Sequence, residues 1–290
     1  MERKAGMRDA LRSVLKAANL ALRIALPLLA GYLLALVLIP TPQIAVIRVE
    51  GDIWGSYTAD ISRALERAGS DRAVRAVVLD VSSPGGEVSA SEGLYYDLLK
   101  LREIKPVVVS IDEMAASGAY YIACAADRIY AKPASMVGNI GVISVLGEAD
   151  LVDEVLITTG PFKLSGGPQD AYIRQMELLK QTFLAAITAQ RQDRLQVGPD
   201  VLSRGEIYLG LQAQQMGLID AIGSQAEAAN EAARLARVRH YRVVDRTPVS
   251  ALESLLPVDE PAGHSTAATV ADLPQGLPPG CYYRYVEQVP

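Results

Sequence analysis

The sequence has few of the residues on which metal and histidine chemistry depend. Its 290 residues include only two histidines, His240 and His264, and two cysteines, Cys124 and Cys281. The histidines leave almost no room for a zinc site or a histidine-based triad, and the cysteines cannot form a metal cluster or a disulfide framework. The net charge of −5 gives no support for nucleic-acid binding, which normally needs a basic face. The phosphate-loop, GxGxxG, HExxH and GxSxG motifs are absent from the sequence as well.

A long uncharged run lies near the N-terminus. Residues 24–39 hold no charge, and with residues 20–22 they reach the roughly 20 apolar residues that span a bilayer. Basic side chains dominate residues 1–19, so the positive-inside rule keeps that segment in the cytoplasm. We therefore expect a single-pass anchor in the cell membrane at residues 20–40, with the rest of the chain on the extracytoplasmic side. A cleaved secretory signal is the alternative, but no small-residue cleavage pattern follows the run.

Beyond the expected anchor, short apolar runs alternate with segments of helical periodicity. This alternation implies a layered α/β core with crossover connections. The predicted strands lie at 43–50, 76–81, 106–111, 128–131, 141–145 and 239–244. The predicted helices lie at 58–68, 89–104, from residue 114 onward, 171–195 and 226–236.

The composition changes after about Arg246. Residues 247–290 contain seven of the chain's 16 prolines, and proline removes a backbone donor and breaks helices. We expect a tail or docking arm without regular structure there. The expected organisation is therefore a basic N-terminus at 1–19, an anchor at 20–40, a folded domain at 41–246 and this tail.

A first candidate site follows the strand predicted at 76–81, in the turn Ser83-Pro84-Gly85-Gly86. Paired glycines let the backbone turn sharply and expose N–H groups that no Cβ obstructs. Such N–H groups bind an extended peptide or a developing oxyanion. A plain strand-to-helix turn is the simpler interpretation of this piece alone.

A second candidate site is Ser117, where the strand at 106–111 gives way to an apolar helical segment. A serine in this position usually does no more than cap a helix. Small residues surround Ser117, however, and the helix dipole favours a negatively charged atom at that end. The amide of Gly118 is then placed to join an oxyanion site, because the residue after the nucleophile donates in other serine hydrolases.

A nucleophilic serine needs a base, and the histidine neighbourhoods do not look like sites, so lysine is the remaining option. The lysines beyond Ser117 are Lys132, Lys163 and Lys180. Lys132 precedes a proline in an expected surface turn, and Lys180 lies on an amphipathic helix. Lys163 is flanked by phenylalanine and leucine with no acidic neighbour, a setting that lowers the pKa of an amine. An exposed loop lysine is the alternative for Lys163.

Four segments in sequence order resemble the signal peptide peptidase (SppA) family, which are membrane-anchored serine proteases of the Clp/crotonase fold. The segments are DVSSPGGEVSAS, MAASGAYYIACAADRIYAKPASMVGNIGV, GPFKLSG and GEIYLGLQAQQMGLIDAIG. The resemblance covers residues 43–244 and implies a layered β-β-α superhelix core. The sequence departs from the family pattern at Asn139, at the two residues after Lys163 and in a shortened stretch before that lysine.

The resemblance implies a Ser–Lys dyad, with Ser117 as the nucleophile and Lys163 as the general base. It places the oxyanion turn at Gly85 and Gly86, joined by Gly118. It further implies a homo-oligomeric ring, peptide substrates such as remnant signal peptides and unfolded segments, and no metal or other cofactor.

Three alternatives stay open at this point. The shortened stretch before Lys163 is also consistent with the related Ser–Lys proteases that cut stomatin-like membrane proteins. A crotonase-type acyl-CoA hydratase or isomerase shares the fold, although an external site speaks against a CoA substrate. A catalytically inactive peptide-binding scaffold is the third alternative, and the presence of both Ser117 and Lys163 argues against it.

Overall fold

The computed structural model describes residues 16, 19–32, 34, 40–145, 167–249 and 280–284. The chain divides into two compact units, Met1–Thr41 and Pro42–Pro290. In the first unit, residues 19–32 are helical and exposed. Within the described residues, no helix combines the length and the apolar character that a membrane crossing requires. The expected anchor also includes residues 33 and 35–39, which lie outside the described residues.

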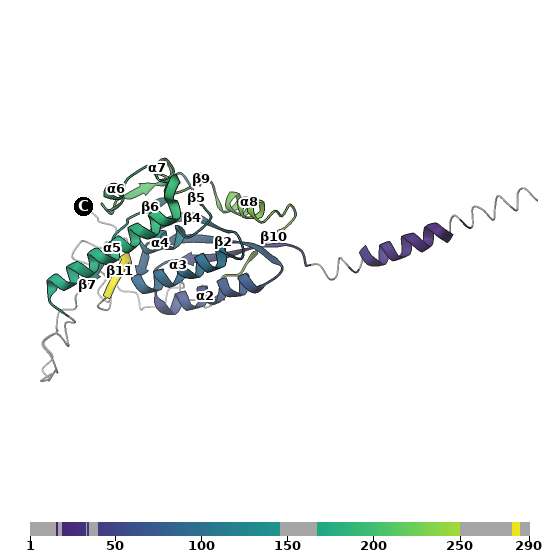
Figure 1. The fold of residues 1–290 in the computed structure, drawn as a ribbon, viewed down its shortest axis with the longest axis horizontal. Coiled ribbons are helices and arrows are strands. Elements are labelled where there is room, and N and C mark those ends of the chain that lie inside the picture. The colour runs from purple at the N-terminus through teal and green to yellow at the C-terminus, as the bar shows by residue number, and fades with distance from the viewer. Residues whose placement is uncertain are drawn as a thin grey trace, which may run out of the picture. The chain divides into compact units, whose positions relative to one another are not determined.

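The second unit is built on a mostly parallel sheet, drawn in Figure 1. Its central strands are rich in valine and isoleucine and nearly continuous in apolar character, as expected for parallel strands covered on both faces. The strand order is β10-β1-β2-β4-β5-β9, and β6 pairs with β4 on one side and β8 on the other. The strands are β1 (Gln43–Glu50), β2 (Val74–Ser83), β4 (Val107–Ala116), β5 (Arg128–Ala131), β6 (Met136–Gly138), β8 (Ile207–Leu209), β9 (Ala221–Ile222) and β10 (Arg242–Asp245).

Helices cover both faces of this sheet. The larger apolar cluster lies on the face that carries α2, α3, α4 and α5, and the smaller cluster joins α8 to the other face. The helices are α2 (Gly55–Ser70), α3 (Val88–Arg102), α4 (Gly118–Ala123), α5 (Gln169–Arg191), α6 (Pro199–Leu202), α7 (Gly210–Gln215) and α8 (Gln225–Leu235), with the 3-10 helix η1 at Gln192–Arg194. The α/β architecture predicted from the alternation is therefore confirmed.

A second, small sheet brings together three segments that lie far apart in the sequence. Strand β11 (Gly280–Arg284) runs between β3 (Gly85–Glu87) and β7 (Ile143–Val145), antiparallel to both. The expectation that the tail lacks regular structure is therefore wrong for these five residues. The physical reason is that β11 forms its backbone hydrogen bonds with the edges of β3 and β7, which both lie outside the proline-rich tail.

Candidate functional site

Ser117 occupies the junction between β4 and α4 and has an unusual backbone conformation. Its φ of 54° and ψ of −120° match the first central residue of a type II′ turn, a position that favours glycine. Its N–H donates a 2.8 Å hydrogen bond to the carbonyl of Gly138 in β6, which fixes the turn. A conformation of this kind costs about 1–3 kcal/mol for a residue with a side chain and persists mainly at functional sites.

The hydroxyl of Ser117 does not cap the helix that follows. The N-terminus of α4 has no side-chain cap hydrogen bond, so the capping interpretation is wrong. Ser117 is only 1% exposed, and the whole of α4 behind it is buried. Ser117 therefore lies in a strained turn but does not cap the following helix, which is the usual role of a serine at this position.

On one side, the glycine turn is held by hydrogen bonds to Ser83 and Ile53. The N–H of Gly85, which has a φ of 101°, donates to the Oγ of buried Ser83 at 3.1 Å. The carbonyl of Gly85 accepts from the N–H of Ile53 at 3.0 Å, and the N–H of Glu87 donates to the carbonyl of Ile53 at 2.9 Å. Because backbone groups alternate in direction along a strand, the N–H and C=O of Gly86 face the opposite edge. Glycine is required at this position, since a Cβ on Gly86 would lie 2.2 Å from the carbonyl oxygen of Ile53.

The sheet register brings the serine and the glycine turn to the same place. Ser83 at the end of β2 pairs with Ala115 near the end of β4, so both turns leave the same edge of the sheet. The helix that Gly118 begins also contacts β3. Ser117, Gly85, Gly86 and Gly118 therefore lie at the same edge of the sheet. The N–H of Gly85 is already bound to Ser83, so Gly86 and Gly118 are the better candidates for donors to a ligand.

Strand β11 occupies the edge that Gly86 presents. Tyr283 stands opposite Gly86, with Tyr282 opposite Glu87 and Arg284 opposite Gly85. On its other side, β11 pairs Cys281 with Ser144 of β7. It also contacts α3 and α4. Sequence reasoning missed β11, because it lies in the proline-rich tail, whereas β7 falls within the strand predicted at 141–145.

Three lysines of the described region form contacts away from the serine. Lys132 is half exposed and forms an ion pair with Asp112, while Lys180 forms a 2.6 Å ion pair with Glu177. Lys105 donates 2.6 Å hydrogen bonds to two carbonyls at the C-terminus of α2. Lys105 lies before the start of β4, whereas Ser117 follows the end of that strand. The predicted base, Lys163, lies outside the described residues. Lys163 belongs to residues 146–166, which lie between β7 and α5 in the sequence and outside the described residues.

The other nucleophilic and metal-ligating candidates do not join this site. Burial raises the pKa of the Cys124 thiol to about 12, so it stays protonated at neutral pH. His240 is exposed beside β10, and His264 lies outside the described residues. Across the described part of the chain, no three histidine, cysteine or acidic side chains are grouped so as to hold a metal ion.

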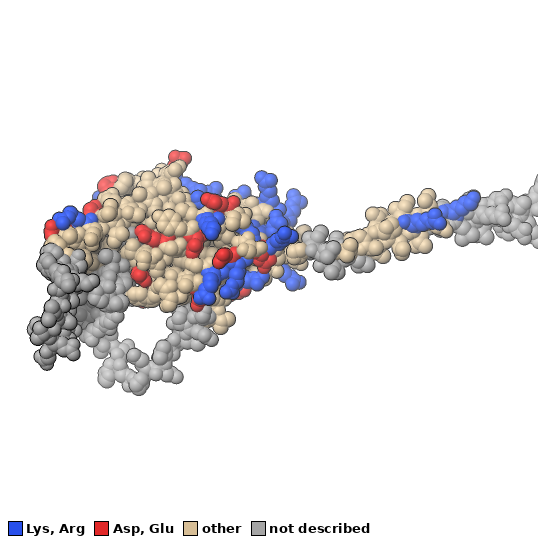
Figure 2. Space-filling model, turned by 60° about the horizontal axis from the view of Figure 1, so that its bottom comes forward, with Lys and Arg blue, Asp and Glu red and all other residues tan. Residues whose placement is uncertain are grey.

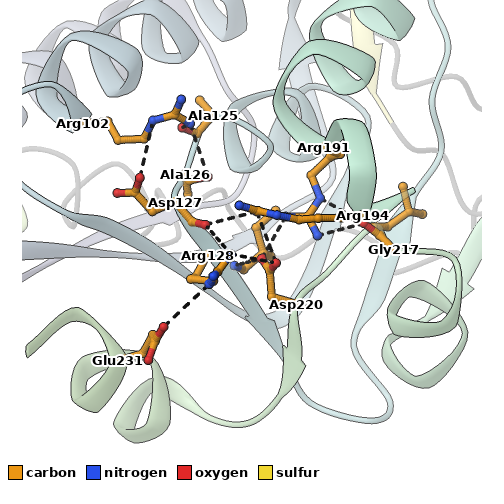
Figure 3. A network of polar contacts seen from close by, with 12 residues as sticks. Arg102, Ala125, Ala126, Asp127, Arg128, Arg191, Arg194, Gly217, Asp220 and Glu231 are labelled. Atoms are coloured by element: carbon orange, nitrogen blue, oxygen red, sulfur yellow. Dashed lines mark hydrogen bonds and ion pairs between the residues drawn. The ribbon is translucent and has the colours of Figure 1, made fainter. Parts of the chain in front are cut away.

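A network of charged side chains ties the C-terminal end of α5 to the sheet (Figure 3). The fully buried Arg191 donates to Asp220 at 2.8 Å, and it donates twice to the carbonyl of Gly217. Asp220 also pairs with Arg194 at 3.2 Å and with Arg128 at 3.6 Å. Helix α5 in turn packs Phe183 against Tyr121 of α4, with ring centroids 5.0 Å apart. The charged network therefore holds α5, which follows the Lys163 segment, against the sheet. The contact between Phe183 and Tyr121 holds the same helix against α4, which follows Ser117.

Comparisons with known proteins agree with this arrangement. Residues 100–239 match the model of Peptidase family S49, and residues 43–154 match NfeD1b, N-terminal domain. Protease 4 of Haemophilus influenzae is 36% identical over 224 residues, which are 70% of this chain and 36% of that protein. A putative protease of Methanocaldococcus jannaschii is 32% identical over 190 residues, which are 60% of each protein. A putative signal peptide peptidase SppA of Enterococcus faecium is 29% identical over 178 residues, which are 57% of this chain and 52% of that protein. The chain thus spans only part of the length of each of these relatives.

A solved structure shares the fold. It is the 1510-N membrane-bound stomatin-specific protease, which aligns with a TM-score of 0.50 and 14% identity over 72% of this chain and 100% of its own. The family match extends from the end of α3 to residue 239, just before β10, and includes the positions of Ser117 and Lys163. Residues 100–239 therefore carry a match to peptidase family S49, and the chain is similar over most of its length to proteases of the signal peptide peptidase (SppA) type.

Proposed function

We propose that this chain is a serine endopeptidase that binds its substrate as an extended strand along β3 and cleaves it with Ser117. Lys163 is the general base in this proposal, and the N–H groups of Gly86 and Gly118 form the oxyanion site. The fold is that of the Clp/crotonase superfamily. The proposal is supported by the match to Peptidase family S49, by the strained turn at Ser117 and by the glycine turn beside it.

The chemistry requires no group beyond the protein and water. The Oγ of Ser117 attacks the scissile carbonyl carbon while its proton passes to the neutral amine of Lys163. The carbonyl oxygen becomes an oxyanion that two backbone N–H groups stabilise. Lys163 then gives the proton to the departing amine, which leaves an acyl-enzyme. Water attacks the ester while Lys163 takes its proton, and Lys163 then gives that proton to the Oγ of Ser117 as the acyl–oxygen bond breaks, which releases the carboxylic acid product.

The observation that carries the proposal is the position of β11. A segment of the chain itself lies antiparallel to β3, with one residue directly opposite Gly86. An edge that accepts Gly280–Arg284 as a strand has the geometry to accept an unrelated peptide, because strand addition depends on backbone groups. Substrate selection on such an edge rests on side chains at alternate positions, so extended and unfolded polypeptides fit it best.

The remaining parts of the proposal concern where the enzyme acts. Residues 20–40 anchor the chain in the cell membrane, residues 1–19 stay in the cytoplasm, and the catalytic unit stands on the extracytoplasmic side. The substrates are remnant signal peptides and other short or unfolded polypeptides. The subunits assemble as a homo-oligomeric ring. The apolar run in the sequence supports the anchor, and the family resemblance supports the substrate class and the ring.

The test uses the full-length chain in detergent with a fluorophosphonate probe and fluorogenic peptides. We expect the probe to modify Ser117, and we expect Ser117→Ala and Lys163→Ala each to lower kcat/KM by roughly 10³-fold or more, because nucleophile and base act as one unit. Lys180→Ala, which removes a surface lysine paired with Glu177, serves as the matched control and should retain activity.

Thermal unfolding of every variant shows whether it is folded. Failure of the probe to modify Ser117 would refute the nucleophile. Activity of folded Lys163→Ala above about a tenth of the wild-type value would refute the base, since loss of a true base costs far more.

A further inference from the structure

Exposed arginines gather at the edge of the sheet opposite Ser117. The segment 71–75 leads into β2, the segment 237–246 leads into and forms β10, and both strands begin at this edge. We call the exposed arginines of these two segments the basic edge; its members are Arg72, Arg75, Arg237, Arg239, Arg242 and Arg246. Figure 2 shows Lys and Arg side chains crowded at the right-hand end of the body, where Figure 1 places β10.

The positive charge of this edge is mostly uncompensated. The acidic side chains of the same two segments are Asp71 and Asp245, which pair with Arg246 at 3.2 Å and with Arg48 at 3.0 Å. Within the described residues, the other five arginines of the basic edge form no ion pair. A local excess of this size stands out in a chain whose net charge is −5.

Helix dipoles explain only part of this charge. Cations are favoured in the last turn of a helix, and Arg67 in α2 and Arg234 in α8 occupy such positions. The effect falls off within that turn, whereas Arg72, Arg239 and Arg242 follow the helix ends. Among the residues that the structure describes, these three side chains have no carboxylate partner of the kind that usually accompanies arginines on a solvated surface.

The basic edge surrounds the point where the chain enters the second unit. The carbonyl of Pro42 accepts a 3.0 Å hydrogen bond from the N–H of Arg242, and the N–H of Gln43 donates to Ala73 at 2.8 Å. Arg246 donates to the side chain of Gln43 at 3.0 Å. Three residues lead from Ile39, at the end of the apolar run, to Pro42, and three extended residues reach about 10 Å. Any bilayer that holds the apolar run is therefore close to this edge.

We propose that the basic edge binds the headgroups of anionic phospholipids in the membrane that anchors the chain. This inference rests on the proposed anchor. Arginine pairs well with phosphate because its planar guanidinium donates two parallel hydrogen bonds. Each arginine close to an anionic surface strengthens binding roughly five-fold at physiological salt. The contact orients the unit, with the entry ends of the parallel strands toward the lipid and Ser117 on the far side.

The experiment places the whole chain in lipid nanodiscs and measures hydrogen–deuterium exchange over residues 237–246. One set of discs contains phosphatidylcholine alone, and the other contains 30 mole per cent phosphatidylglycerol. We expect exchange in this segment to slow several-fold in the anionic discs, and we expect 0.5 M NaCl to remove the difference because salt screens the attraction.

Two triple variants make the test specific. The variant Arg72→Gln, Arg239→Gln, Arg242→Gln should lose the lipid-dependent protection. The matched control Arg63→Gln, Arg174→Gln, Arg204→Gln removes the same charge from exposed positions outside the basic edge, and it should keep the protection. Equal exchange in both lipids, or equal loss of protection in both variants, would overturn the proposal.

Flotation separates failure of this inference from failure of the anchor. Full-length protein that floats with pure phosphatidylcholine vesicles in high salt is anchored by its apolar run, whatever the basic edge does. Protein that does not float under these conditions refutes the anchor and with it the membrane setting of the proposal.

Discussion

At the scale of single residues, the site depends on two positions that do not suit ordinary side chains. Ser117 has a positive φ, and Gly86 has no room for a Cβ. The backbone of Ser117 is strained, whereas at Gly86 the neighbouring carbonyl leaves space for glycine alone. Each position gives one prediction, which is tested against a control substitution.

For Ser117, two inactive variants should differ in stability. Ser117→Ala keeps a Cβ in the strained conformation, whereas Ser117→Gly removes the steric cost of a positive φ. We expect Ser117→Gly to be more stable than Ser117→Ala by about 1 kcal/mol in urea unfolding, reduced somewhat by the greater freedom of unfolded glycine. Equal midpoints for the two variants would mean that the turn stores no strain.

For Gly86, an added methyl group should act through the backbone of Ile53. The Cβ would come within 2.2 Å of that carbonyl oxygen, so β3 has to move away from it. We expect Gly86→Ala to lose at least about 100-fold in kcat/KM, because a shift of about 1 Å at a catalytic group costs that much. Gly93→Ala in α3 is the matched control, since nothing lies within 4 Å of its Cβ. Full activity of Gly86→Ala would remove the glycine turn from the site.

At the scale of elements, the buried charges around Asp220 hold α5 in place. Replacing Arg191 by Met keeps most of the side-chain volume but leaves the carbonyl of Gly217 without its two side-chain donors. We expect Arg191→Met to lower the free energy of unfolding by about 3 kcal/mol, since a broken buried pair and an unpaired carbonyl both contribute. Arg174→Met on the same helix, where the arginine is exposed, should change it by less than about 0.5 kcal/mol. Similar losses in both variants would contradict the role of the network.

The buried thiol of Cys124, which follows α4, gives a pH-dependent contribution to stability. Burial raises the pKa of Cys124 from 9.0 to about 12, so the folded state keeps a proton that the unfolded state loses. The stabilisation is therefore complete below about pH 9 and is lost as the pH rises toward 12. We expect Cys124→Ala to show a shallower loss of stability over this range in chemical unfolding. Tyr57 contributes to the remaining slope, because burial raises its pKa to about 12 as well. Identical slopes would contradict the assignment to Cys124.

The elements that the sequence predicted well are those whose character is local. Strand β1 was predicted with its observed bounds, since an uninterrupted apolar run of this length has few other uses. Strand β4 extends five residues beyond its predicted end, to Ala116, because pairing with β6 overrides the weak strand preference of Met114 and its alanine neighbours. Strands β3 and β11 could not be predicted, because each is formed by contacts with residues more than a hundred positions away. Ser117 was found from its motif, but its backbone strain is visible only in the structure.

At the scale of the whole molecule, the chain occupies its own proposed substrate position. A substrate must displace β11 from the edge of β3, and an edge that is free for a tenth of the time raises the apparent KM about ten-fold. We therefore expect a chain that ends at Pro279 to have a lower KM for short peptides with an unchanged kcat. A chain that ends at Arg284 keeps β11 and serves as the control.

A second variant guards against damage from the truncation. Tyr283→Pro removes the backbone N–H opposite Gly86, so it should release the strand and lower KM in the same way. Unchanged KM values in both the truncated chain and Tyr283→Pro would show that β11 does not compete with substrate.

Strand β4 also sets how far a polypeptide must extend from the membrane to be cut. Its ten residues separate the entry edge of the sheet from Ser117 by about 33 Å. With the basic edge on the lipid, a chain still embedded in the bilayer needs about ten extended residues outside it before a peptide bond arrives at the serine. Short loops of neighbouring membrane proteins then cannot reach Ser117. The length of the strands therefore protects such loops from cleavage.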